Sequence, residues 1–294
     1  MSAAIEEYHV ANAGAGPYGI TTGPDGALWF SLIHAGQIAR RSADGELVVH
    51  QLDPPTCRPS LITPGADGAL WFTESQSNRI TRITTTGELS SFEVPTPDSG
   101  PFGIASGPDD ALWFTQMTAD QIGRLTPEGE FREYALPESG AFPSMITCGP
   151  DSALWFTMNQ SDAIGRISAE GMIDIYELST PGAAPVGITS TVDGIWFAEI
   201  GTSQIGCITT TGEMLEFPLP SRDARPHAIV SDGQGSCWFT EWAANRIGRI
   251  EPSGSITEFE LPTPNSEPHG ITIGSDQAVW VALENGAVAR VAPT

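Results

Sequence analysis

The sequence predicts an all-β protein, a seven-bladed β-propeller made of four-stranded antiparallel blades. The first observation is a repeat of 41 or 42 residues, marked by seven tryptophans: Trp29, Trp71, Trp113, Trp155, Trp196, Trp238 and Trp280. The second is that seven prolines keep the same spacing: Pro17, Pro59, Pro101, Pro143, Pro185, Pro226 and Pro268. A constant period of this length is typical of repeat architectures such as propellers. Because 294 residues divide into seven units of 42, we expect residues 1–294 to form a single domain.

Within each repeat, the residues indicate four short strands in a fixed order. A proline opens a short apolar segment, as at 17–20, and a turn with Gly, Pro and Asp follows at 23–26. The next strand is apolar, as in ALWFS at 27–31, and a third strand follows after a loop, as in RITRI at 79–83. The last strand alternates apolar and polar residues, as in ITEFEL at 256–261. Short alternating segments separated by turn residues predict one antiparallel sheet per repeat.

The two ends of the chain carry the parts of one blade. The seventh repeat ends at 289–291 and contains no fourth strand. The N-terminal segment IEEYHV at 5–10 resembles the fourth strands of the other repeats. We therefore expect the N-terminal strand to complete the last blade and close the ring, which removes an open sheet edge. A linear solenoid would need polar capping repeats, and the sequence contains none.

Composition narrows the classes of function. The net charge of −23 disfavours nucleic acids and anionic membrane surfaces as partners, because both repel a strongly acidic protein. The same charge favours a soluble surface, and we expect a monomer. The chain contains no lysine, so a lysine Schiff base is excluded as a mechanism.

The expected location is the cytoplasm. The first ten residues lack the basic region and long apolar core of a signal peptide, and no apolar run is long enough to span a membrane. The four cysteines form no CxxC pair and follow neither a zinc nor a disulfide spacing: Cys57, Cys148, Cys207 and Cys237. Reduced thiols in a cytoplasmic protein fit this pattern best.

The seven evenly spaced prolines, which we call the register prolines, are each followed by a residue that differs between repeats. In order along the chain this residue is Tyr18, Ser60, Phe102, Ser144, Val186, His227 and His269. Two imidazoles thus fall at equivalent places in the last two blades, in the segments RPHA and EPHG. A residue before proline is expected to be extended, and side chains two apart on an extended chain share a face. We therefore expect Glu267 and His269 to face one space, as Arg225 and His227 should.

A second carboxylate follows the strand at 278–282. Glu284 should lie at the rim where Glu267 and His269 begin their strand, although a one-residue shorter loop leaves it matching either Glu241 or Trp242. Two carboxylates and water could hold a hard divalent cation, with Mg²⁺ the natural choice, and a neutral histidine beside it could act as a base. The alternative is that these are hydrated polar groups lining a wet channel.

Three histidines lie outside this pattern. His9, His34 and His50 fall in terminal or loop-like places, and we expect them to be surface residues. The seven periodic tryptophans are explained by packing within the blades. The eighth, Trp242, has no counterpart in the repeat.

The whole chain resembles the virginiamycin B lyase family, seven-bladed propellers that inactivate type B streptogramin antibiotics. Strands such as LWFTE at 70–74 and RIGRI at 246–250 carry the general part of the resemblance, which many propellers share. The specific part is SEPHGIT at 266–272, together with RPHAI at 225–229 and Glu284.

The resemblance implies a site and a reaction. It implies that Glu267 and Glu284 bind Mg²⁺, that His269 is the general base and that His227 contacts the substrate, a small cyclic depsipeptide closed by a threonyl ester. The base removes the α-proton of that threonine and the ester oxygen leaves from the β-carbon, so that no water is consumed. The apolar rim residues could accept the aromatic groups of the antibiotic: Tyr18, Phe102, Val186 and Trp242.

Other functions remain open from the sequence. One is a metal-dependent lactone hydrolase of the gluconolactonase kind, which would consume water. Another is a non-catalytic binding propeller whose histidines merely line the channel. A relative of the lyases that acts on some other compound is also open.

Overall fold

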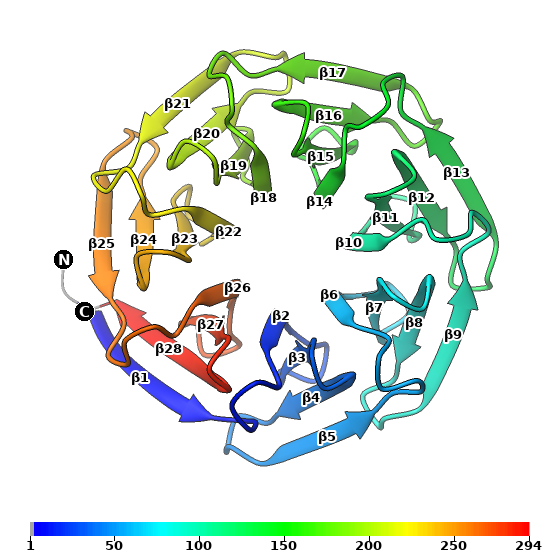
Figure 1. Cartoon of the computed structure of the whole chain (residues 1–294), viewed down its shortest axis with the longest axis vertical. Coiled ribbons are helices and arrows are strands. Elements are labelled where there is room, and N and C mark those ends of the chain that lie inside the picture. Colours follow the sequence, from blue (N-terminus) through cyan, green and yellow to red (C-terminus); the bar gives the residue numbers. More distant parts are fainter. Residues whose placement is uncertain (1–2, 294) are drawn as a thin grey trace.

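A computed structural model describes residues 3–293, and within that range it contains 28 β-strands and no helix. The strands form seven separate four-stranded antiparallel sheets arranged in a ring (Figure 1). The prediction of a seven-bladed all-β propeller is therefore confirmed. The part of the chain described includes no helix long and apolar enough to cross a membrane.

Each blade is ordered from the centre of the ring outward. The inner strands all begin at a register proline: β2 (Pro17–Thr22), β6 (Pro59–Pro64), β10 (Pro101–Ser106), β14 (Pro143–Cys148), β18 (Pro185–Ser190), β22 (Pro226–Ser231) and β26 (Pro268–Ile273). The second strands are fully buried: β3 (Leu28–Leu32), β7 (Leu70–Glu74), β11 (Leu112–Gln116), β15 (Leu154–Met158), β19 (Ile195–Glu199), β23 (Cys237–Glu241) and β27 (Val279–Leu283). Proline suits the first residue of a strand because it has no N–H to donate to a neighbour.

Two further layers complete the blades. The third strands are β4 (Gln37–Arg41), β8 (Arg79–Ile83), β12 (Gln121–Leu125), β16 (Ala163–Ile167), β20 (Gln204–Ile208), β24 (Arg246–Ile250) and β28 (Ala287–Pro293). The outer strands are β5 (Leu47–Gln51), β9 (Leu89–Glu93), β13 (Phe131–Ala135), β17 (Ile173–Glu177), β21 (Met214–Pro218), β25 (Ile256–Glu260) and β1 (Ala3–His9). We number the blades 1 to 7 from the one that begins with β2.

The N-terminal strand closes the ring, as the sequence predicted. β1 pairs antiparallel with β28, so that blade 7 has the order β1-β28-β27-β26, and the two strands lie side by side in Figure 1. Tyr8 of β1 lies 5.7 Å from the Trp280 ring, measured between ring centroids. Glu7 accepts a hydrogen bond of 3.2 Å from the backbone N–H of Thr263, which ties β1 to the loop arriving from blade 6.

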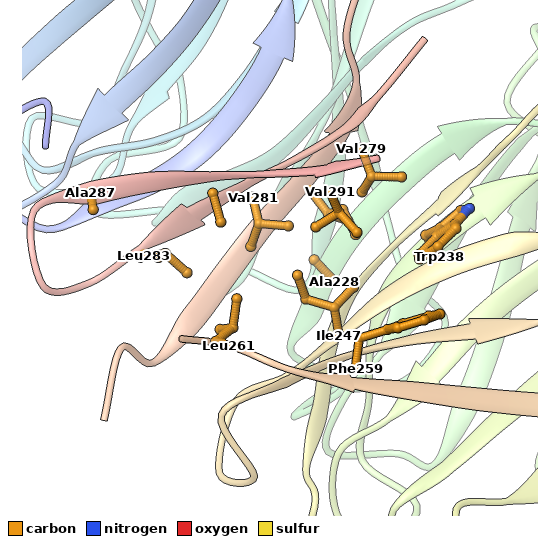
Figure 2. Close-up of a cluster of buried hydrophobic side chains, with 12 residues drawn as sticks. Ala228, Trp238, Ile247, Phe259, Leu261, Val279, Val281, Leu283, Ala287 and Val291 are labelled. Carbon is orange, nitrogen blue, oxygen red and sulfur yellow. The ribbon is translucent and has the colours of Figure 1, made fainter. Parts of the chain in front are cut away.

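The core consists of clusters between neighbouring blades. Six tryptophans stack on a ring of their own outer strand: Trp29 on His50, Trp71 on Phe92, Trp113 on Tyr134, Trp155 on Tyr176, Trp196 on Phe217 and Trp238 on Phe259. The seventh, Trp280, packs on Tyr8 of its outer strand with the two rings tilted by 31°. Figure 2 shows one cluster, in which Trp238 and Phe259 of blade 6 pack with Val279 and Val291 of blade 7. Burying one tryptophan removes roughly 150–250 Å² from water, so packing suffices to explain the seven periodic ones.

A hydroxyl bridge joins most inner strands to the preceding blade. The side chain of Thr115 accepts a bond from the Gly103 N–H at 2.8 Å and donates to the Ser144 carbonyl of the next blade at 2.6 Å. Bridges of this kind reach the residue after the register proline at five of the seven junctions: Ser31 to Ser60, Thr73 to Phe102, Thr115 to Ser144, Thr157 to Val186 and Thr240 to His269. At the other two junctions, those reaching His227 and Tyr18, alanine takes the place of the hydroxyl residue: Ala198 and Ala282.

Candidate active site

The site lies at one end of the ring, which we call the mouth. Inner strands begin at the mouth and second strands end there, so Pro268 pairs with Leu283 across β26 and β27. The inner strand contains one extra residue directly after the proline, because Ile271 is the next residue to pair, with Val281. A bulge of this kind can re-aim the side chains of the bulged strand. His269 sits in this bulge, and Glu284 directly follows the facing strand.

The backbone before each register proline differs from the expectation. All seven residues have a left-handed conformation, with φ between 47° and 67°: Gly16, Arg58, Gly100, Phe142, Ala184, Arg225 and Glu267. The expectation of an extended chain was wrong: although a residue before proline usually is extended, each of these residues lies in a turn. The turn presents the carbonyl of Glu267 to the N–H of Glu284, at 3.2 Å. Glu267 and His269 are therefore not neighbours on one face of an extended strand.

The strand pairing also settles the register of Glu284. Its N–H donates to Glu267, just as the N–H of Trp242 donates to Arg225 at 3.2 Å. Leu283 pairs with Pro268 as Glu241 pairs with Pro226. Glu284 thus matches Trp242, and the missing residue lies after it in the loop.

The carboxylate of Glu284 lies between two imidazoles. Its Oε2 is 3.0 Å from Nε2 of His269, and its Oε1 is 2.6 Å from Nε2 of His34. The hydrogen bond from His269, followed by that from His34, lowers the pKa of Glu284 although burial opposes it. An ionised carboxylate can only accept hydrogen bonds, so both imidazoles donate from Nε2 in this arrangement.

His34 was not recognised from the sequence. It is exposed, as expected of a surface residue, with 45% of its side chain accessible, but it contacts the site directly. The missing step was to treat blades 7 and 1 as neighbours in a closed ring. In the repeat, His34 directly follows Ile33, which matches Glu284, so its mouth loop lies beside that of blade 7.

Three aromatic rings from blades 1, 6 and 7 meet beside this carboxylate. The centroid of Tyr18 is 4.7 Å from that of His269, and the two histidine centroids are 5.0 Å apart. The Tyr18 hydroxyl lies 3.3 Å from Nε2 of His227. A close backbone approach allows this, since a Cβ on Gly270 would lie 2.2 Å from the Tyr18 carbonyl oxygen.

Burial keeps two of these rings neutral. It lowers the pKa of His227 to about 3, with a smaller contribution from His269. Burial, followed by the charge of Glu284, raises the pKa of Tyr18. Both groups can therefore exchange hydrogen bonds at neutral pH but carry no charge.

The remaining rim residues lie around this centre. The Phe102 ring is 6.1 Å from that of Tyr18, and Val186 is buried in a cluster with Phe102. Trp242 is half-buried on the mouth loop of blade 6, with the Arg225 guanidinium 5.8 Å from its ring centroid. These positions give the mouth an apolar surface next to its polar centre.

Two carboxylates at the mouth are of the kind that could bind a hard cation. Among residues 3–293, no group of three or more His, Cys, Asp or Glu side chains is arranged to hold a metal ion. The mouth does offer two carboxylates on adjacent backbone segments, the exposed Glu267 and the half-buried Glu284. Mg²⁺ usually binds through one or two carboxylates and several waters, which matches this donor set.

The fold and this site define a seven-bladed propeller with a histidine–carboxylate centre at its mouth. A model of the Virginiamycin B lyase family matches residues 3–291, and the chain belongs to that family.

Individual relatives agree. A solved structure described as a streptogramin B lyase is 43% identical to this chain, covers 99% of it and 97% of its own chain, and superposes with a TM-score of 0.95. A catalytically inactive histidine-to-alanine variant of virginiamycin B lyase from Staphylococcus aureus, solved with quinupristin, is 40% identical over 100% of both chains, with a TM-score of 0.94. Virginiamycin B lyase of Saccharopolyspora erythraea is 58% identical over 49 residues, a segment that spans 17% of this chain and 16% of that relative.

Proposed function

We propose that this chain is a carbon–oxygen lyase that linearises type B streptogramins and thereby confers resistance to them. The observation that carries the proposal is the contact of His269 with Glu284 at the mouth, 3.0 Å long, in a chain 43% identical to a streptogramin B lyase. The binding of quinupristin by the Staphylococcus aureus relative supports a cyclic depsipeptide as substrate. That relative is inactive without one histidine, which supports an imidazole at the centre of the reaction.

The reaction is a β-elimination at the threonyl ester. His269 accepts the α-proton of the threonine, and the electrons of that C–H bond form a double bond to the β-carbon. The bond from the β-carbon to the ester oxygen breaks, and its electron pair leaves with the oxygen as a carboxylate. A positioned imidazole base contributes roughly 10²–10⁴ in rate.

The proton moves at Nε2 of His269, the nitrogen that faces Glu284. The reacting tautomer carries its own proton on Nδ1 and a lone pair on Nε2, and the Nε2–H that forms in the transfer donates to Glu284 across the 3.0 Å contact. Glu284 stabilises that protonated ring. The Nδ1 atom is buried and has no hydrogen-bond partner among the described residues, so it does not compete for this role.

Tyr18 and His227 act as neutral hydrogen-bonding groups. Their pKa shifts keep them uncharged, and they lie together beside His269. We assign them to the ester that departs, whose oxygen gains negative charge in the transition state. The aromatic groups of the antibiotic would lie on Phe102, Val186 and Trp242.

Glu267 and Glu284 would hold Mg²⁺ at this mouth. When bound, the cation supplies positive charge that stabilises the negative charge developing on the substrate. We further propose that the protein acts in the cytoplasm as a monomer.

A mass measurement tests the proposal. The protein is incubated with a type B streptogramin, with and without a chelator, and the product is followed by mass spectrometry. Elimination gives an open chain of unchanged mass that contains a dehydrated threonine, and the chelator should suppress it. A product heavier by one water would show a lactone hydrolase instead, and a ring that stays closed at every metal concentration would refute the assignment.

A further inference from the structure

The mouth contains a third imidazole, and it comes from the first blade. His34 follows β3, and its Nε2 lies 2.6 Å from Oε1 of Glu284, a residue 250 positions later in the chain. The other oxygen of the same carboxylate is taken by His269 at 3.0 Å. Both carboxylate oxygens are therefore fixed by N–H donors, one from each side of the junction between blades 7 and 1.

His34 is held in place by its own blade. Its backbone N–H donates to the carbonyl of Ala15 at 3.0 Å. Its ring lies against Gly16, where an added Cβ would come within 2.5 Å of the His34 Cδ2 atom. Gly16 also has a φ of 67°, so glycine both suits the turn and leaves the space that the imidazole occupies.

The other blades carry no imidazole at this place. The matching residues are Gln76, Thr118, Gln160, Gly201, Ala243 and Asn285. Glu284 is itself unusual, because its counterpart in blade 6 is Trp242. The two exceptional residues thus occur on adjacent loops and contact each other.

We propose that His34 is a positioning residue that orients the Glu284 carboxylate toward His269 and the cation. A glutamate has three rotatable bonds, and Glu284 is partly exposed, with 25% of its side chain accessible. Without the bond to Oε1, this carboxylate samples other rotamers, and the bond from Oε2 to His269 is no longer fixed. Removing a residue that orients a ligand typically costs 10–100-fold in metal affinity or activity. The inference rests on the proposed function for its kinetic consequence, but not for the contact itself.

The test compares His34→Ala with His34→Gln and with Gln76→Ala, a control at the matching exposed position of blade 2. The first readout is the ¹⁵N NMR signal of the His269 ring, assigned by its loss in His269→Gln, in the absence of substrate and metal. The second is the affinity for Mg²⁺ by calorimetry, and the third is kcat and KM for a type B streptogramin.

In His34→Ala we expect shifted His269 signals, a Mg²⁺ affinity and a kcat each lower by about 10–100-fold, and a KM within about twofold of the parent value. His34→Gln should recover most of each loss, because its amide can donate to Oε1, and Gln76→Ala should match the parent. His269 signals or a kcat unchanged in His34→Ala would overturn the proposal. If the parent protein leaves the antibiotic ring closed, the proposed function fails, while the His269 signals still decide whether His34 positions Glu284.

Discussion

The two ends of the ring differ in how their residues repeat. At the end opposite the mouth, five blades contain the same cluster, in which a tryptophan N–H and an arginine Nε both donate to one aspartate: Asp25 with Trp29 and Arg40, Asp67 with Trp71 and Arg82, Asp109 with Trp113 and Arg124, Asp151 with Trp155 and Arg166, and Asp276 with Trp280 and Arg290. At the mouth, the side chain after the register proline is Tyr, Ser, Phe, Ser, Val, His and His in turn. Repeated contacts indicate folding, whereas unrepeated ones indicate chemistry.

The repeated clusters are charged and intact at neutral pH. Burial alone would raise the pKa of Asp109, but hydrogen bonds from Trp113 and Arg124 outweigh burial and lower it. The same balance lowers the pKa of the other four aspartates. The stability that these clusters contribute is present above the ordinary aspartate pKa and is lost as the pH falls through the lowered value.

The largest expected effect is the loss of activity when an unrepeated residue of the mouth is removed. His269→Ala should lower kcat by about 10²–10⁴-fold, because it removes the proposed base, while the thermal unfolding midpoint changes little. Ser144→Ala, at the same register position of blade 4, should retain parent activity. Turnover of a type B streptogramin, followed by mass spectrometry, measures both variants. Equal activities for the two variants would mean that the mouth does not act through its unrepeated residues.

The reverse experiment uses a repeated residue. Trp71 is fully buried in blade 2, so Trp71→Ala should lower the free energy of unfolding by about 3–5 kcal/mol. The activity of the molecules that remain folded should be unchanged, because blade 2 holds none of the proposed catalytic groups. Denaturant unfolding and activity normalised to the folded fraction provide the measurement. A kcat reduced as strongly as in His269→Ala would erase the distinction between the ends.

A third experiment compares one buried position in two blades. Glu74 is paired with Arg79, Nη2 to Oε2 at 2.5 Å, whereas neither carboxylate oxygen of Glu241 has a partner within the described part of the chain. Burial, followed by the charge of Glu258, raises the pKa of Glu241 to about 8 despite the opposing charge of Arg246. The folded state therefore keeps a proton that the unfolded state releases, and stability falls as the pH rises from about 4 to about 8.

Opposite outcomes are expected for the two glutamates. Glu241→Gln should remove this pH-dependent loss, so its unfolding midpoint should exceed that of the parent by a margin that grows up to about pH 8. Glu74→Gln should instead lose about 1–3 kcal/mol at neutral pH, because it breaks a hydrogen-bonded pair to a charged group. Unfolding midpoints between pH 4 and pH 9 test both. If the difference between the unfolding midpoints of Glu241→Gln and the parent stays constant with pH, Glu241 has an ordinary pKa.

The smallest effect concerns the hydroxyl bridges. Thr115→Val and Thr240→Val should each cost about 1 kcal/mol of stability, because each replaces a hydrogen-bonded hydroxyl with a methyl group of similar size. Thr240 holds the carbonyl of His269 at 2.9 Å, so Thr240→Val should also lower kcat by about 2–10-fold, whereas Thr115→Val should not. Matching kinetics for the two variants would indicate that this bridge supports the fold alone.

The repeated features were predictable because they recur seven times. The positions of the tryptophans and prolines specified the blades, and the resemblance of 5–10 to other outer strands predicted the closing strand. The conformation at Glu267 was not predictable, because the residue before a proline can adopt a left-handed turn as well as an extended one. The register of Glu284 needed the strand pairing, since one residue is missing from its loop. His34 required the closed ring, in which residues 250 positions apart become neighbours.

The closing strand has a consequence for protein synthesis. Translation reaches β28 284 residues after it begins β1, counting from Ala3 to Ala287. At about 5–20 residues per second, that delay is on the order of 15–60 s, during which β1 has no strand to pair with. Blade 7 carries His269 and Glu284. A nascent chain that already contains the first six blades therefore still lacks these two residues of the mouth. The proposed site is therefore complete only after blade 7 has been made, when the earliest-made strand can pair with the latest.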